Sequence, residues 1–349
     1  MSAKRTTVHT VFESEILSQS QLLSERTATG REAANKAAAL LDSSVTHLVI
    51  AARGSSDCVA TYLQYLVGRE LGVLTALATP SLYSDPRHVM LKGALVIGIS
   101  QSGRSPDVVS VLTAARTQGR PTIAITNDVL SPMAEQADVV MPLLVGEEVS
   151  LAATKTMLAS LQAASQFVES VLGEDLPEAR DLPAMIATTS AWALRHVQPA
   201  LADLNLHGLT VVGRGLGLSS AEECALKIRE VAGIRAEAYA SPDLLHGPIG
   251  ADGTGSSMWL IVTDEIDDES VADLVSRARA SGMTTLVSRS SARGATKADV
   301  ELVLPVLSPN WTMPFLNVVV GQVMALRLGE ANRRPIDQPP GLKKITLTR

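Results

Sequence analysis

The sequence predicts an α/β protein of two tandem domains, each a doubly wound, mainly parallel sheet flanked by helices. Apolar runs of strand length alternate with helical patterns along the chain, which is typical of parallel sheets covered on both faces. The 349 residues suffice for two domains with separate cores, and 46% of them are hydrophobic. The two halves also share features at a constant offset, which indicates one unit present twice.

The first half reads as a helix followed by a series of strands and helices. Residues 11–26 place apolar side chains among polar ones, as an amphipathic helix does. An apolar run ends at Arg53-Gly-Ser-Ser56, and the next helix ends at Gly72. We expect strands at 47–52, 74–78, 95–100, 122–126 and 139–144, and helices at 11–26, 56–71, 81–90, 105–117 and 150–172.

The second half follows a segment at 174–183 whose prolines and charges predict a linker. We expect strands at 209–212, 236–239, 258–263, 284–288 and 300–304, and helices at 184–204, 219–232, 270–281 and 314–328. These assignments divide the chain into an N-terminal helical segment at 1–35, a first domain at 36–175, a second domain at 184–335 and a C-terminal tail at 336–349.

Matching glycines suggest that the second series repeats the first. Arg53-Gly54 and Arg214-Gly215 each end a strand, and Gly72 and Gly233 each end the next helix. The offsets agree, since 214 − 53 and 233 − 72 both give 161. Duplication of one α/β unit would place a site between the copies or between subunits. Chance agreement of a few glycines is the alternative.

Composition excludes several classes of protein. A net charge of −6 with 3% aromatic residues argues against nucleic-acid binding. Cys58 and Cys224 form neither a disulfide framework nor a metal-type pair, so we expect buried thiols. Residues 1–10 hold no apolar signal core, and the apolar stretch 315–328 is interrupted and short for a bilayer. We therefore expect a soluble cytoplasmic protein with no membrane partner.

The stretch 95–107 predicts an anion site. Its apolar run ends at Ser100-Gln-Ser-Gly103, after which Ser105 can cap a helix that Pro106 begins. Free amides and the hydroxyls of Ser100, Ser102 and Ser105 could then face one space. The stretch lacks the Gly-Lys-Ser/Thr ending of a nucleotide P-loop, so a phosphorylated metabolite fits better than ATP. Arg53-Gly-Ser-Ser56 repeats the pattern, and simple helix capping is the alternative at both places.

Three further segments carry groups for acid, base or carbonyl chemistry. Lys227 and Glu230 share one face of a helix, with Glu223 one turn earlier, and a solvated ion-pair ladder is the alternative. His246 precedes a turn and is an acid/base candidate, although a structural histidine would look the same. Lys343 and Lys344 lie in the tail, where a lysine folded over a site could form a Schiff base with a sugar carbonyl. The alternative is a solvent-exposed pair.

Five motifs, in this order, resemble one family. They are Ser100-Gln-Ser-Gly103, Ala225-Leu-Lys-Ile-Arg-Glu230, Ala236-Glu-Ala-Tyr239, His246-Gly-Pro248 and Asp337-Gln-Pro339. From about residue 12 onward, the chain resembles the double sugar isomerase (SIS) region of isomerizing glutamine:fructose-6-phosphate aminotransferases. Those enzymes carry a glutaminase domain that this sequence does not show. The chain therefore looks like the stand-alone SIS-type glucosamine-6-phosphate deaminases, and its loop Ser102-Gly-Arg-Ser-Pro-Asp107 is similar to theirs.

The resemblance implies a role for each candidate. Glu230 would move a proton between C1 and C2, His246 would open the sugar ring, and Lys344 would serve carbonyl or imine chemistry. The substrate-binding candidates are Ser55, Ser56, Ser100, Gln101, Ser102, Ser105 and Lys227. The family pattern needs no metal or cofactor, brings the tail to the active site, and takes the histidine from a neighbouring subunit, which implies a homodimer with sites at its interface. Ala153 stands where the aminotransferases have a serine, which puts one substrate contact in doubt.

Three functions compete at this point. The leading hypothesis is a glucosamine-6-phosphate deaminase that yields fructose 6-phosphate and ammonia. The second is an isomerase or deglycase of another phosphorylated amino sugar or sugar–amine conjugate. The third, from a different class, is a sugar-phosphate sensor without turnover, which the presence of Glu230 and His246 disfavours.

Overall fold

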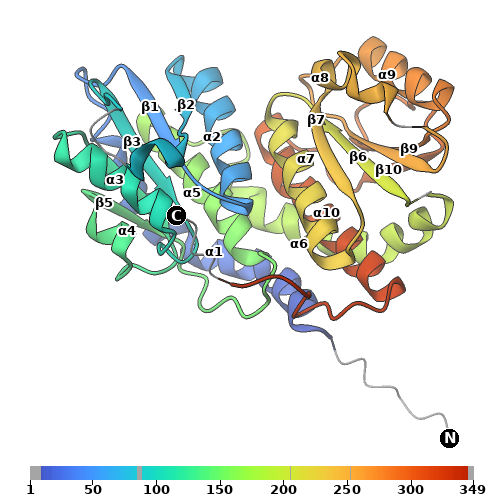
Figure 1. The fold of residues 1–349 in the computed structure, drawn as a ribbon, viewed down its shortest axis with the longest axis horizontal. Helices are drawn as coiled ribbons and strands as arrows, with labels where there is room; N and C mark the ends of the chain where they lie inside the picture. Colours follow the sequence, from blue (N-terminus) through green and yellow to red (C-terminus); the bar gives the residue numbers. More distant parts are fainter. Residues whose placement is uncertain (1–8, 85–88, 205, 252, 345–349) are drawn as a thin grey trace, which may run out of the picture.

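The computed structural model describes residues 9–84, 89–204, 206–251 and 253–344. It contains two α/β units side by side, each built on a five-stranded parallel sheet with helices on both faces (Figure 1). This arrangement confirms the predicted fold class.

The first unit holds the sheet order β2-β1-β3-β4-β5, with every pair parallel. Its strands are β1 (His47–Ala51), β2 (Leu74–Leu77), β3 (Ala94–Ile99), β4 (Thr122–Thr126) and β5 (Val139–Pro142). Its helices are α2 (Ser55–Leu71), α3 (Pro106–Thr117), α4 (Pro132–Glu135) and α5 (Lys155–Leu172). Alternate residues of β1 enter cores on opposite faces, Ile50 on one side and Val49 on the other. Burial on both faces explains why these strands are continuous apolar runs.

The second unit repeats this topology with the order β10-β9-β8-β6-β7. Its strands are β6 (Gly208–Gly213), β7 (Ala236–Ala240), β8 (Ser256–Ile261), β9 (Thr284–Ser290) and β10 (Val300–Leu304). Its helices are α6 (Leu182–Ala200), α7 (Leu216–Lys227), α8 (Ser241–Leu245), α9 (Asp268–Ala280) and α10 (Met313–Ala331). Replacing β1 to β5 by β6 to β10 in the order of the first sheet gives the order of the second sheet. The predicted repeat is therefore a repeat of topology.

The backbone supports the same equivalence. Gly54 precedes α2 with φ 58° and ψ −133°, and Gly215 precedes α7 with φ 56° and ψ −128°. Both values fall in a region that side-chain-bearing residues rarely adopt. Gly72 and Gly233 both end the following helical segment in the left-handed conformation. Chance agreement of glycines therefore does not account for the offset.

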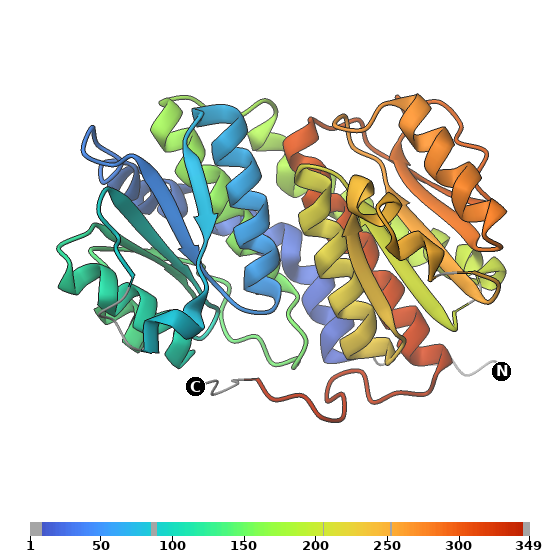
Figure 2. The ribbon, with the colours of Figure 1, turned by 45° about the horizontal axis from the view of Figure 1, so that its top comes forward.

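Helices join the two units into one body. Helix α2 packs against α7, and α1 (Val11–Ala38) packs against α5, α6 and α10. One hydrophobic core runs through these contacts and includes the fully buried Phe12 and Ile16. The C-terminal tail leaves α10 and crosses back from the second unit to the first (Figure 2).

Several predicted boundaries are wrong. Helix α1 extends to Ala38, and α5 begins at Lys155 rather than residue 150, because the preceding residues form a loop around Glu148. The helix expected at 81–90 is a short 3-10 turn, Pro80–Ser84, and residues 85–88 of that prediction lie outside the described residues. The helix expected to run to Ala232 changes to a π turn at Ile228–Ala232.

The apolar stretch near the C-terminus also needs correction. The segment Asn310–Ala331 is long and apolar enough to cross a membrane, contrary to the expectation from its length. In the fold, 94% of its most apolar window is buried inside the protein. Its contacts with α6 and α7 make it a central core helix.

Candidate functional site

The candidate site lies at the carboxyl ends of β1 and β3. These neighbouring strands continue in opposite directions across the sheet, β1 to β2 and β3 to β4. Loops diverge at such a switch point and leave a crevice where ligands bind in doubly wound sheets. A pocket of about 340 Å³ opens there. The topology therefore explains why the serine-rich loops after β1 and β3 meet.

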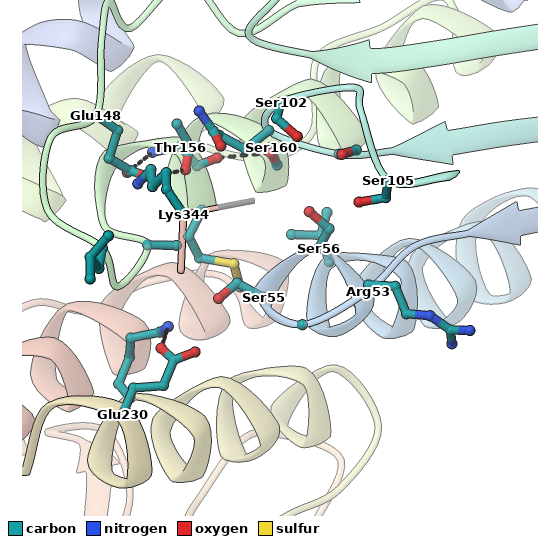
Figure 3. Close-up of a pocket in the computed structure, with 18 of the residues that line it drawn as sticks. Arg53, Ser55, Ser56, Ser102, Ser105, Glu148, Thr156, Ser160, Glu230 and Lys344 are labelled. Carbon is teal, nitrogen blue, oxygen red and sulfur yellow. Dashed lines mark hydrogen bonds and ion pairs between the residues drawn. The ribbon is translucent and has the colours of Figure 1, made fainter. Parts of the chain in front are cut away.

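Hydroxyl groups line one end of the pocket (Figure 3). They come from the start of α2 and from the loop between β3 and α3, and the candidates among them are Ser55, Ser56, Ser100, Ser102 and Ser105, together with Gln101. All six predicted binding residues of the first unit thus line one pocket. The N-termini of α2 and α3 both start here, and each adds unpaired amides and positive dipole charge.

The loop after β3 is held in a shape that leaves its hydroxyls available. Gly103 has φ +61°, and a side chain there would collide with Ser131. Ser105 stands at the N-cap of α3, but its side chain makes no capping hydrogen bond. The predicted capping role of Ser105 is therefore wrong, and its hydroxyl lines the pocket instead.

A buried charge cluster on the second unit closes the opposite wall. Lys227 pairs with Glu230, and its Nζ lies 3.6 Å from Oε1 of Glu223. The side chains of Lys227 and Glu223 are 0% exposed, whereas that of Glu230 is 21% exposed. The alternative of a solvated ion-pair ladder is therefore wrong. Lys227 and Glu230 line the pocket, so the carboxylate of Glu230 is the member of the cluster that a ligand can reach.

Burial and charge act against each other in this cluster. Burial disfavours the charged amine of Lys227, but Glu223 and Glu230 outweigh it and raise its pKa. Burial raises the pKa of Glu223 to about 7, although Lys227 and the Ser55 hydroxyl lower it in part. Lys227 therefore stays an ammonium ion that holds Glu230 in place.

Two local features concern this cluster and its link to the hydroxyl-lined end of the pocket. Glu230 lies in the π turn Ile228–Ala232, and such turns are frequent at functional sites because they shift side chains out of the α-helical phase. The Ser55 hydroxyl donates to Oε1 of Glu223 over 3.2 Å. The start of α2 in the first unit is thus connected to α7 in the second.

The tail brings Lys344 to a third wall. Its Nζ lies 3.0 Å from Oε2 of Glu148 and donates to the carbonyl of Ser150 over 2.6 Å. Lys343 lines the pocket as well. The alternative of a solvated lysine pair is wrong for Lys344, because its amine is bound to two acceptors.

Several lining residues escaped prediction. They lie on the loop before α5 and on its first turns, and the polar ones are Glu148, Thr156 and Ser160. Periodicity gives no signal for Glu148, since it lies in a loop that only the tertiary fold brings to the pocket. Ala153 lines the pocket too, so the position that lacks the expected serine does face the ligand space.

His246 is the one candidate that this chain does not bring to the pocket. It follows α8, is exposed, and its Nδ1 donates to the carbonyl of Pro242 over 2.8 Å. Because that carbonyl only accepts, Nε2 is left as the ring nitrogen that can take up a proton.

Among the described residues, no thiol lines the pocket. Within the part of the chain that the structure describes, no group of three or more His, Cys, Asp or Glu side chains is suited to hold a metal ion. Cys58 and Cys224 are free and buried, as predicted, and burial raises the pKa of both thiols.

Sequence comparisons agree with the motifs. Residues 41–170 match the family model described as the SIS domain. The isomerizing glutamine–fructose-6-phosphate aminotransferase of Halobacterium salinarum is 28% identical over 319 residues, and that of Pyrobaculum aerophilum is 30% identical over 310. The matches cover 86% and 85% of this chain and 51% of each relative. The chain thus spans about half the length of the curated relatives that it matches.

Solved structures share the whole fold. A candidate phosphosugar isomerase of Silicibacter pomeroyi has a TM-score of 0.83 and 28% identity, covering 94% of this chain and 99% of its own. The C-terminal domain of the Francisella tularensis glucosamine-fructose-6-phosphate aminotransferase has a TM-score of 0.84 at 21% identity, covering 97% and 100%. The Thermotoga maritima glucosamine-6-phosphate deaminase has a TM-score of 0.77 at 19% identity, covering 97% of this chain and 100% of its own. The last two show the fold alone.

Proposed function

We propose that this chain, a SIS domain protein with tandem SIS-like units, is a phosphosugar isomerase that converts glucosamine 6-phosphate and water to fructose 6-phosphate and ammonia. One observation carries the proposal. A single pocket unites a hydroxyl-lined anion cradle from the first unit, the carboxylate of Glu230 from the second and the amine of Lys344 from the tail.

The cradle suits the phosphate of the sugar. Two helix N-termini and the hydroxyls of Ser56, Ser100, Ser102 and Ser105 supply donors without a lysine-bearing P-loop, which fits a small phosphate monoester. A phosphate held there fixes the sugar chain along the pocket toward α7. Such anchoring turns the proton transfer into an intramolecular step.

Glu230 suits the role of base. In the open-chain amino sugar it would remove the proton from C2 and return it to C1, which leaves an imine at C2. Water then adds to C2, and ammonia leaves to give the ketone. Lys227 keeps the carboxylate oriented from behind, so we assign Lys227 a positioning role rather than direct substrate binding. Lys344 lies where an amine can interact with the carbonyl or imine.

Ring opening needs an acid/base group, and no histidine lines this pocket among the residues that the structure describes. We propose that His246 of a second copy supplies it, which makes the working unit a homodimer. Support comes from its exposed position and from the Nδ1 contact with Pro242, which leaves Nε2 available. A phosphorylated metabolite as substrate also fits a cytoplasmic location, which stays a prediction.

An isomerase for another phosphorylated sugar is the second candidate. The Silicibacter pomeroyi structure, with its higher identity, is described as a candidate phosphosugar isomerase. Ala153 also faces the pocket in place of a hydroxyl, so the contacts to the sugar can differ from those in the aminotransferases.

A substrate panel tests the proposal. Purified protein is incubated with glucosamine 6-phosphate, with its N-acetyl derivative, and with ketose and aldose 6-phosphates that lack nitrogen, and ammonia and ketose phosphate are assayed. We expect ammonia and fructose 6-phosphate in equal amounts from glucosamine 6-phosphate. Isomerization of a nitrogen-free sugar without ammonia release would favour the second candidate. Thermal stabilisation by every sugar phosphate with no product would contradict both and indicate a sensor.

A further inference from the structure

A buried carboxylate outside the predicted site holds the tail lysine. Glu148 lies in the loop between β5 and α5, and its side chain is 1% exposed. Isolated charges are seldom buried this deeply, because removal from water costs several kcal/mol. The surroundings of Glu148 must therefore compensate for its burial.

The start of α5 supplies that compensation. Oε1 of Glu148 accepts from the backbone amides of Thr154 and Thr156 over 2.9 and 3.0 Å, and Oε2 accepts from the Thr156 hydroxyl over 2.8 Å. Burial alone would raise the pKa of Glu148, but Lys344 and these hydrogen bonds outweigh it and lower the pKa. The carboxylate is thus a fixed anion at the N-terminus of α5.

Lys344 meets this anion in a defined geometry. Its amine lies 3.0 Å from Oε2 of Glu148 and 2.6 Å from the Ser150 carbonyl, and both acceptors belong to the same loop. Figure 3 shows the two side chains pointing toward each other at the pocket wall. A protonated amine suits two such acceptors, since all three of its hydrogens can donate.

A second anchor fixes the tail seven residues earlier. The carboxylate of Asp337 accepts from the backbone amides of Val11 and Phe12 at the start of α1, over 3.1 and 2.8 Å. Leu151 donates its amide to the Asp337 carbonyl over 3.3 Å. The tail therefore crosses from the second unit to the first between two fixed ends, of which Glu148 holds the one at the pocket (Figure 2).

We propose that Glu148 is the positioning residue for Lys344: its carboxylate docks the tail on the pocket and holds the lysine amine at a fixed place in the wall. Glu148 acts through Lys344 and does not itself exchange protons with the sugar. The kinetic consequence rests on the proposed function, whereas the placement of Lys344 does not.

Chemical labelling tests the placement without any substrate. The protein is treated briefly with acetic anhydride at neutral pH, and acetylation of Lys344 is compared with that of Lys343 by mass spectrometry. Lys343 is exposed and has no ion pair within the described part of the chain, so it is an internal reference. We expect Lys344 to react roughly tenfold more slowly than Lys343 in the wild type, because its amine donates to two acceptors in the pocket wall and must leave them before it attacks the anhydride. Equal rates in the wild type would overturn the proposal, whether or not any variant folds.

Two variants then assign the effect to the carboxylate. Glu148→Gln keeps the shape and removes the charge, and we expect the Lys344 rate to approach that of Lys343. Glu148→Asp keeps the charge and should retain most of the protection. Unchanged protection in a folded Glu148→Gln protein would contradict the proposal.

A double-mutant cycle separates positioning from a structural role. With a substrate that the enzyme turns over, Glu148→Gln should lower kcat in the wild-type background but cause no further loss in the Lys344→Met background. Equal losses in both backgrounds would show that Glu148 acts independently of Lys344 and would overturn the proposal. Absence of turnover with every sugar phosphate would refute the proposed function, while the labelling result would still decide the position of Lys344.

Discussion

The two repeated units share a fold, but the surroundings of the N-termini of their equivalent helices α2 and α7 differ. At the start of α2 in the first unit, Ser55 and Ser56 line an open pocket. At the start of α7 in the second unit, the amide of Leu216 donates to the carboxylate of Glu265 over 2.9 Å. A carboxylate of the protein thus lies at the N-terminus of α7, whereas the N-terminus of α2 faces an open pocket.

The loops after the equivalent strands differ accordingly. Strand register pairs Ser100-Gln-Ser102 after β3 with Val262-Thr-Asp264 after β8. The side chains of Val262 and of ionised Asp264 cannot donate to a phosphate, and Thr263 donates its hydroxyl to Glu265 over 3.2 Å. The second switch point is therefore closed from within.

The C-terminal ends of the two helical segments that begin with α2 and α7 also carry different residues at equivalent positions. At the 161-residue offset, Glu230 corresponds to Arg69 and Lys227 to Leu66. Glu230 faces the open pocket of the first unit, and Arg69 lies 3.6 Å from Glu265 at the closed position of the second. One pseudo-equivalent position thus lines a pocket, and the other forms an ion pair. Under the proposed function, the first unit would hold the phosphate and the second would supply the base.

The largest effect on kcat is expected at Glu230, the proposed base. Glu230→Gln should lower kcat by about 10²- to 10⁴-fold, the usual contribution of a general base, and leave KM within about threefold. Arg69→Gln is the matched control at the equivalent position and should change kcat less than about twofold. Steady-state kinetics of both variants measure this difference. Equal losses of kcat would remove the distinction between the two positions.

Binding of the sugar phosphate should depend on the loop after β3 in the first unit and not on the equivalent loop after β8 in the second. Ser102→Ala removes a hydroxyl from the cradle and should weaken sugar-phosphate binding about 10- to 100-fold, as expected for a hydrogen bond to a charged group. Thr263→Val, at the loop position of the second unit that corresponds to Gln101, should leave that affinity unchanged. Calorimetric titration with the substrate or inorganic phosphate checks both. Comparable losses in the two variants would argue against a single anion site.

The stability of the protein should depend on pH through Glu222, which lies on α7, the helix that packs against α2. Burial raises the pKa of Glu222 to about 7, although a hydrogen bond from Thr61 lowers it in part and Asp57 adds to the rise. A carboxyl with a raised folded-state pKa favours folding below about pH 4.5, and this contribution is lost as pH rises through 7. The wild type should therefore lose roughly 1–3 kcal/mol relative to Glu222→Gln between pH 4.5 and 8. Urea unfolding across this range measures it, and parallel profiles would contradict the placement of Glu222.

The smallest effect on stability is expected at Glu265, whose carboxylate accepts the hydrogen bond from Leu216 at the start of α7. Glu265→Gln weakens the hydrogen bond at the start of α7 and its ion pair with Arg69, so the free energy of unfolding should fall by about 1 kcal/mol. Because this position holds no substrate, KM should stay the same. Urea denaturation and KM are measured on the same preparation. A KM that rises tenfold would show that the second switch point takes part in binding.

Local sequence rules predicted most of the fold and the serine-rich loops that line one end of the pocket. Alternation of apolar runs identified the strands, and the serines after two of them lie together because parallel strands end at one edge of the sheet. The wrong boundaries have local causes as well. Residues 150–154 have helical composition, yet Glu148 draws the amides of Thr154 and Thr156 toward its carboxylate, so the helix begins at Lys155.

Long-range contacts were beyond those rules. Glu148 meets Lys344 across 196 residues of sequence, and Ser55 meets Glu223 across 168. Periodicity marked Lys227 and Glu230 as neighbours but could not distinguish a buried cluster from a solvated ladder, because burial depends on how α2 packs against α7. His246 stays a prediction, since its role depends on a second copy of the chain.

Hydrogen exchange at the sugar carbons tests the proposed role of Glu230 most directly. Fructose 6-phosphate and an ammonium salt are incubated with enzyme in D2O, so that the imine at C2 can form, and deuterium at C1 is followed by NMR for the wild type and for Glu230→Gln at saturating substrate. Proton transfer between C1 and C2 by Glu230 predicts rapid exchange with the wild type and exchange at least about 100-fold slower with the variant. Equal exchange rates in the two proteins, or none in the wild type, would contradict the assignment of proton transfer to Glu230 in the second unit.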